Sequence, residues 1–248
     1  MATLVLAGIM LAVAAGAEPC APAGMSREQL LELKSHEFAV GDDGRRQSLA
    51  LALLACLGSP DPQLRDGVAF EALSTWMRGK QLSAATVGTI LDRLQPQLAP
   101  AYPDPAGVQR PFAVLVLAEV VRFDRVEPFM TEQQFQQLVD AGTRYLQSVN
   151  DYRGFDEREG WRHGVAHASD LMLQLAVNPR TSKARLDQML AAIASQSRTC
   201  GPAFLRAWRR RAPRTSGVLH REAQAARCRR VAEVVRPGGR ARAAGELG

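Results

Sequence analysis

The sequence predicts an all-α fold, and three observations support this prediction. Apolar residues recur every three or four positions along most of the chain, which is the spacing of a helix face. Hydroxyl residues followed three positions later by Gln are typical helix starts, because each side chain satisfies a backbone amide of the other residue. No stretch alternates apolar and polar residues for long enough to predict a strand. The 248 residues, 46% of them hydrophobic, also lack a collagen period, sustained heptads and dense cysteines, which excludes fibrous and disulfide-scaffold classes.

Eight helices are expected in chain order. The first follows Ser26, which is paired with Gln29, and the sixth follows Thr131, which is paired with Gln134. Short links rich in Pro, Gly and Asp, such as 58–62 and 100–107, separate the helices. The apolar helical segments are 30–33, 49–57, 68–76, 83–94, 108–123, 135–149, 161–177 and 182–193.

The spacing of these segments predicts how the helices are arranged. Strong apolar segments begin roughly 19 to 30 residues apart, as expected for helix hairpins stacked side by side. We therefore expect stacked antiparallel helix pairs, a HEAT-like α-α superhelix. No repeat is visible at the level of individual letters, and a compact helical bundle is the alternative.

The N-terminus resembles a secretory signal peptide. Residues 4–14 form an uncharged apolar run that is too short to cross a ~30 Å hydrocarbon core, and Ala15-Gly16-Ala17 is a typical cleavage site. We expect a signal peptide at 1–17, a mature chain that begins at Glu18 without a transmembrane helix, and a periplasmic or secreted location. No charged residue precedes the apolar run, and a buried first helix is the alternative interpretation.

Cysteine usage is sparse. Cys20, Cys56, Cys200 and Cys228 form no CxxC pair, so neither a metal site of that type nor redox chemistry is predicted. Disulfides would be permitted in an exported chain. Cys56 lies inside a Leu- and Ala-rich segment, and we expect it to be a small core residue rather than a disulfide partner.

Charge divides the chain into two parts. Residues 198–248 contain 13 Arg, no Lys and three acids, whereas the preceding residues carry a net charge of −4. The body therefore shows no nucleic-acid footprint, and no nucleic-acid partner is expected. Arg, Ala, Gly and Pro dominate the tail, which is the bias of a GC-rich gene read out of frame. We expect a helical domain at 18–197 and a frameshifted, poorly ordered tail at 198–248; a basic arm is the alternative.

One segment could carry chemistry. A charged loop at 151–160 precedes the helix predicted at 161–177. At 100° per residue, four polar residues fall within about 60° of one another and form one polar stripe: His163, His167, Asp170 and Gln174. Two imidazoles and a carboxylate could bind a divalent metal. Gly164 stands where a zinc protease would have its general-base Glu. The other interpretation is that these side chains hydrogen-bond to neighbouring helices. Trp161 falls in the apolar arc and is expected to be a buried core residue.

The same segment resembles a known family. Its letters YRGF and GWRHGVAHASDL, together with RDGVAFEALSTW at 65–76 and RPFAVLVLAE at 110–119, are similar to stretches of the DUF2785 family of uncharacterised helical proteins. The resemblance runs from about Met25 to Gln196 and implies an all-helical, HEAT-like domain without an assigned activity. Its motif candidates here are Gly160, Trp161, His163, His167 and Asp170.

Two functions remain from the sequence. The first is a non-catalytic exported binding or scaffold protein that holds a protein or an envelope component on a concave face. The second is a metal-binding protein or metal-dependent hydrolase with His163, His167 and Asp170 as ligands; no other cofactor is expected. The binding role is favoured because the segment lacks a recognisable nucleophile or general base.

Overall fold

The computed structural model describes Cys20 and residues 22–199. The signal peptide predicted at 1–17 and nearly all of the tail predicted at 198–248 lie outside these residues.

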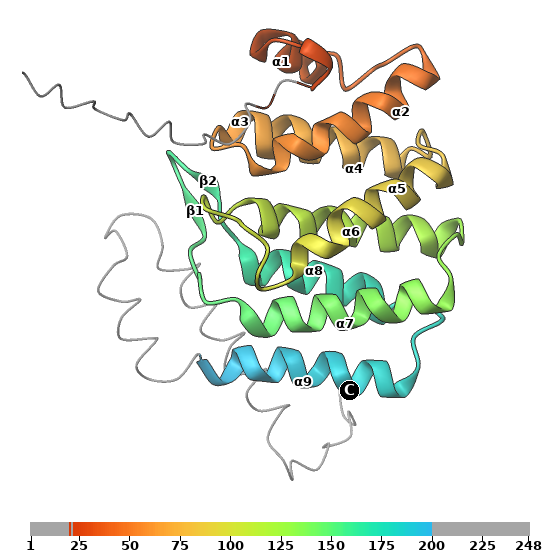
Figure 1. Cartoon of the computed structure of the whole chain (residues 1–248), viewed down its shortest axis with the longest axis vertical. Coiled ribbons are helices and arrows are strands. Elements are labelled where there is room, and N and C mark those ends of the chain that lie inside the picture. Colours follow the sequence, from red (N-terminus) through yellow and green to blue (C-terminus); the bar gives the residue numbers. More distant parts are fainter. Residues whose placement is uncertain (1–19, 21, 200–248) are drawn as a thin grey trace, which may run out of the picture.

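The described residues form an all-α fold, as predicted (Figure 1). A two-stranded antiparallel hairpin, β1 (Phe155–Asp156) and β2 (Gly160–Trp161), interrupts the helices. No helix in this part of the chain is long and apolar enough to span a membrane. The α helices are α1 (Arg27–Ser35), α2 (Asp43–Ala52), α3 (Pro62–Leu64), α4 (Glu71–Arg78), α5 (Ala84–Leu94), α6 (Gln109–Val126), α7 (Glu132–Ser148), α8 (Gly164–Ala176) and α9 (Lys183–Thr199). Tighter 3-10 turns occupy η1 (Pro22–Gly24), η2 (Leu53–Gly58) and η4 (Gln95–Leu98), and a wider π-helical turn occupies η3 (Arg65–Phe70).

Both predicted capping boxes are present. The Ser26 hydroxyl accepts a hydrogen bond from the Gln29 amide, and the Gln29 side chain accepts one from the Ser26 amide. Thr131 and Gln134 make the same reciprocal pair at the start of α7. Each pair satisfies two amides that the first helical turn would otherwise leave without partners.

The helices form two layers. One layer contains α4, α6 and α8, and the other contains α5 with η4, α7 and α9 (Figure 1). Between the α4 segment and α6, Phe70 contacts Phe112 and Arg78 pairs with Glu119. Between α6 and α8, Phe112 contacts His167 and Arg125 donates to Gln174. Because residue numbers rise together along these contacts, α4, α6 and α8 run in the same direction. Successive helices therefore alternate between the layers as antiparallel pairs, whereas a HEAT-like superhelical rise stays a prediction.

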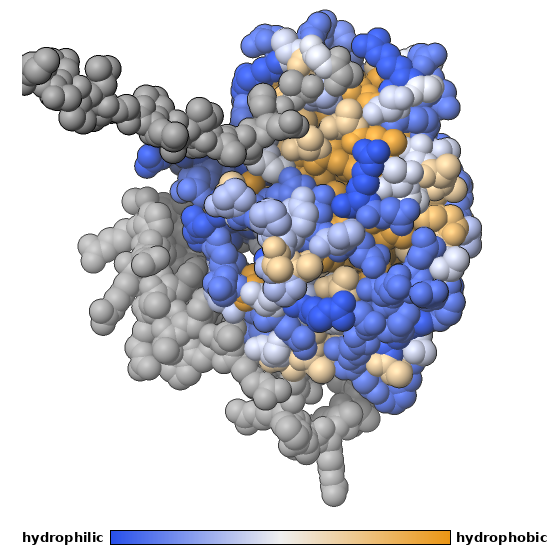
Figure 2. All heavy atoms as spheres, viewed as in Figure 1, coloured by the Kyte–Doolittle hydropathy of each residue, from blue (hydrophilic) through white to orange (hydrophobic). Residues whose placement is uncertain are grey.

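The core lies between the layers, and α6 is its centre. α6 is apolar on nearly every side, which is the pattern of a helix enclosed by others. Trp76 on α4 is fully buried, and its indole N–H donates to the Phe38 carbonyl at 2.9 Å. In Figure 2, polar residues cover most of the visible face, while apolar residues gather near α1 and α2. A small cavity of about 180 Å³ lies there, lined in part by Met25, Leu33 and Val40.

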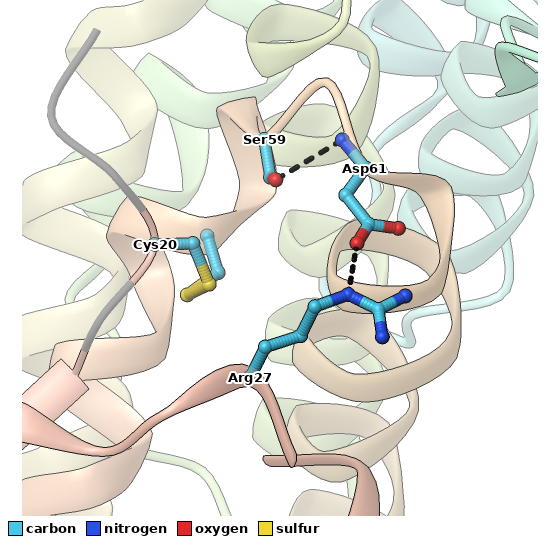
Figure 3. The surroundings of a disulfide bond; sticks show 5 residues. Cys20, Arg27, Ser59 and Asp61 are labelled. Atoms are coloured by element: carbon cyan, nitrogen blue, oxygen red, sulfur yellow. Dashed lines mark hydrogen bonds and ion pairs between the residues drawn. A yellow bond between two sulfur atoms is a disulfide. The ribbon is translucent and has the colours of Figure 1, made fainter.

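A disulfide joins Cys20 to Cys56, so the prediction that Cys56 is not a disulfide partner is wrong (Figure 3). Cys56 is fully buried, as expected, but it is buried as one half of the disulfide and not as a free thiol. The sequence alone does not reveal that the residues before α1 fold back against η2. Nearby, Arg27 Nε donates to Asp61 Oδ2 at 2.7 Å, which also fastens α1 to the link after η2.

Candidate functional site

The hairpin is docked onto η3 by a buried ion pair. Arg65 is 1% exposed and donates to the carbonyls of Ser59 at 2.9 Å and Glu159 at 2.6 Å. Its Nε lies 2.7 Å from Asp66 Oδ1, close enough for an ion pair but without the angle of a hydrogen bond. The other oxygen of Asp66 accepts the Trp161 amide at 3.0 Å. Burial raises the pKa of Asp66, although its bond to the Trp161 amide and the charge of Arg65 oppose that rise.

Gly160 allows this close approach. Its φ is +72°, and a Cβ there would lie 2.5 Å from the Pro62 side chain, 2.7 Å from Asp66 Oδ2 and 2.8 Å from Arg65 Nη2. Only glycine adopts this backbone conformation readily and leaves the required space. Glycine at position 160 therefore allows the hairpin to pack directly against the π-helical turn η3.

Trp161 is not the buried core anchor that the helical pattern predicts. It lies in β2, and its side chain is 43% exposed. Helix α8 begins at Gly164 rather than at position 161. The prediction is wrong because the backbone of Trp161 is held in the hairpin by Asp66, so the 100° rotation of a helix does not apply to it.

Aromatic contacts connect the hairpin to the core. The Trp161 ring lies 4.9 Å from Phe155 and 4.3 Å from His163, measured between ring centroids. His163 lies 5.8 Å from His167, which packs edge-on against Phe112 at 5.1 Å. The predicted His163–His167 proximity is therefore present, although His163 precedes the helix instead of lying within it.

His167 is a buried, neutral histidine. It is 7% exposed, and its Nδ1 lies 3.1 Å from the Pro111 carbonyl. Burial lowers its pKa to about 4, and the charges of His163 and Arg65 act in the same direction. A neutral ring that donates from Nδ1 keeps Nε2 as an acceptor, and Nε2 makes no hydrogen bond within the described part of the chain. Burial also lowers the pKa of His163.

These residues line a groove of about 500 Å³ on the layer formed by α4, α6 and α8. Helix α6 supplies Leu115, Ala118 and Glu119, α4 supplies Glu71 and Arg78, and the hairpin supplies Trp161. The predicted stripe of α8 faces this groove. It consists of His163, just before the helix, and His167, Asp170 and Gln174.

The described residues of the groove do not form a cluster of potential metal ligands. Within residues 22–199 and Cys20, no three His, Cys, Asp or Glu side chains come close enough to hold a metal ion. The predicted set of His163, His167 and Asp170 therefore shares a groove without converging on one point. Partial burial raises the pKa of Asp170, and the charge of Glu119 adds to this effect.

Four side chains of the site were not predicted from the sequence. Arg65 and Asp66 dock the hairpin, and Arg78 pairs with Glu119 across the groove. A signal for the first two exists, because RDG at 65–67 belongs to a stretch that resembles the family. The Arg78–Glu119 pair has no local signal, since 41 positions separate its members.

Comparison with known proteins found one relationship. No curated protein matches the chain, and no solved structure does. A family model described as "Protein of unknown function (DUF2785)" matches residues 102–207, which include α6, the hairpin and α8. The match begins later than the resemblance expected from Met25 and extends beyond Gln196. The region 102–207, which carries most of the groove, therefore belongs to the DUF2785 family.

Proposed function

We propose that this chain is a non-catalytic binding domain whose groove on α4, α6 and α8 holds a segment of a partner protein or of another envelope component. The observation that carries the proposal is the convergence of the motif residues Trp161, His163, His167 and Asp170 on one groove. The described residues that line it include no Ser, Thr or Cys that could act as a nucleophile. A pocket of this size is typical of a ligand-binding site, and here aromatic rings lie beside eight polar or charged side chains.

The same proposal places the protein in the periplasm or outside the cell. The Cys20–Cys56 disulfide supports this location, because disulfides persist in oxidising compartments and are rare in the cytosol. The apolar run at 4–14 and the small residues at 15–17 support it from the sequence.

Photo-crosslinking in cells of the source organism tests the groove. A photoreactive phenylalanine at Leu115, on the groove floor, should give discrete adducts, and the same group at exposed Asp92 on α5 should not. Adding Ala166→Trp, which fills the groove, should abolish the adducts at Leu115. Equal adducts at both positions, or adducts that survive Ala166→Trp, would contradict the proposal.

A metal-binding role is the second candidate. The Nδ1 of His167 bonds to a carbonyl oxygen, which is how metal-ligating histidines are commonly oriented, and Asp170 lines the same groove. Elemental analysis of the purified chain separates the two functions. The metal role would be favoured if the chain holds about one equivalent of a divalent metal and both His163→Ala and His167→Ala lose it. The binding role would be favoured if metal-free protein still forms the photo-crosslinked adducts at Leu115.

A further inference from the structure

The carboxylates of the groove differ in whether a cation neutralises them. Three have partners: Asp66 lies 2.7 Å from Arg65, Glu71 lies 3.0 Å from Lys34, and Glu119 is paired with Arg78. Asp170 makes no hydrogen bond or ion pair within the described residues. The groove therefore presents one uncompensated negative charge.

This charge lies at a definite distance from the aromatic end of the groove. His163 immediately precedes α8, and Asp170 lies six positions after the first helical residue, Gly164. At 1.5 Å of rise per residue the helix separates Gly164 from Asp170 by about 9 Å, so the two ends of the groove are about 10 Å apart. The Trp161 ring is tilted at 49° against His163 and is 43% exposed, so it is available at that end. An extended peptide covers about 10 Å in three residues.

A second, independent feature lies between the two ends. His167 is 93% buried and lines the groove, yet its Nε2 has no partner among the described residues while Nδ1 is bound to Pro111. Because His167 lines an open groove, its Nε2 is available to accept a hydrogen bond from a ligand that enters. The amide N–H groups of an extended backbone between the two anchors would supply the donor for that bond.

We infer that the groove binds an extended segment of a partner protein that carries an aromatic residue and, three positions away, a lysine or arginine. The aromatic side chain stacks on Trp161, a backbone N–H donates to His167 Nε2, and the cation pairs with Asp170. This inference rests on the proposed function and names the chemistry of its partner.

Isothermal titration calorimetry on the full chain tests the inference with four peptides. The lead peptide is acetyl-Trp-Ala-Ala-Lys-amide. In the controls norleucine or Glu replaces Lys, or Ala replaces Trp. The lysine peptide should bind about two- to fivefold more tightly than the norleucine peptide, the value of one exposed ion pair, and the Glu peptide should bind most weakly.

Matched variants assign the effect to the groove. Asp170→Asn should weaken binding of the lysine peptide about two- to fivefold and leave binding of the norleucine peptide unchanged. Asp92→Asn, on the other layer, should change neither. Trp161→Ala should remove the preference for Trp over Ala in the peptide.

The outcomes separate this inference from the proposed function. Equal binding of the lysine and norleucine peptides, or equal effects of Asp170→Asn and Asp92→Asn, overturns the inference. No peptide binding, or adducts at Leu115 that prove by mass spectrometry to be glycan, overturns it while the groove remains a binding site. Loss of specific adducts at Leu115 overturns the proposed function itself.

Discussion

Replacing Gly160 by Ala probes the contact that positions the whole site. A methyl group there meets Pro62, Asp66 and Arg65 within 2.5–2.8 Å, and the φ of +72° becomes unfavourable. The left-handed conformation costs about 1–2 kcal/mol. Moving the hairpin away also breaks the bond from the Trp161 amide to the Asp66 carboxylate, which is worth about 1.5–3 kcal/mol. We therefore expect Gly160→Ala to lower the free energy of unfolding by about 2.5–5 kcal/mol.

Two other glycines provide controls for urea denaturation. Gly24 has a φ of +73° but open space around its Cβ position, so Gly24→Ala should show the conformational cost alone, about 1–2 kcal/mol. Gly41 has open space and no such φ, and Gly41→Ala should change stability by less than about 0.5 kcal/mol. A loss for Gly160→Ala no larger than that for Gly24→Ala would refute the argument that the hairpin is pressed against η3.

The remaining predictions concern the core, the disulfide, pH and processing. By urea denaturation, Trp76→Ala should cost about 3–5 kcal/mol because the indole is fully buried, whereas Trp161→Ala should cost about 1–2 kcal/mol; the reverse order would contradict their burial. Cys20→Ser and Cys56→Ser should each cost about 2–4 kcal/mol and should not differ much, since both remove one bond; wild type unaffected by dithiothreitol would contradict this. Burial holds the pKa of His167 in the folded chain at about 4, below its ordinary value of 6.5. As the pH falls, the unfolded chain therefore takes up this proton first, and the free energy of unfolding should fall by about 3 kcal/mol between pH 7 and pH 4. His167→Gln should remove that part of the pH dependence, and an unchanged profile would argue against a buried neutral ring. N-terminal sequencing of the exported chain should begin at Glu18, and a retained Met1 on cytosolic protein would contradict the signal peptide.

Sequence reasoning worked where the signal is local. The capping boxes at Ser26 and Thr131 formed as predicted because their partners lie three residues away. Helical periodicity likewise identified the segments of α4 to α9, since one face of each helix packs into a common core. The shared groove position of His167, Asp170 and Gln174 follows from the same geometry.

Sequence reasoning failed where a distant contact overrides the local pattern. Trp161 fits the apolar arc of a helix, but Asp66, 95 positions earlier, holds its amide in a hairpin. Cys56 fits a core segment, and only the path of the preceding residues brings Cys20 to it. His167 was assigned to a polar stripe, yet α6 covers it, because the approach of two helices is not encoded in the periodicity of one.

Because of the disulfide, the two ends of the helix stack are expected to unfold at different rates. Among the described residues, α1 and α9 lie at the two ends of the stack, so local opening is expected to begin at one of these ends. At the N-terminal end, the Cys20–Cys56 bond and the Arg27–Asp61 pair fasten α1 and the residues before it to η2 and the link that follows η2. On α9, Leu186 is 37% exposed and Leu190 is 53% exposed. Amide exchange should therefore be fastest in α9 and propagate toward α1, and reduction of the disulfide should let the array open from both ends.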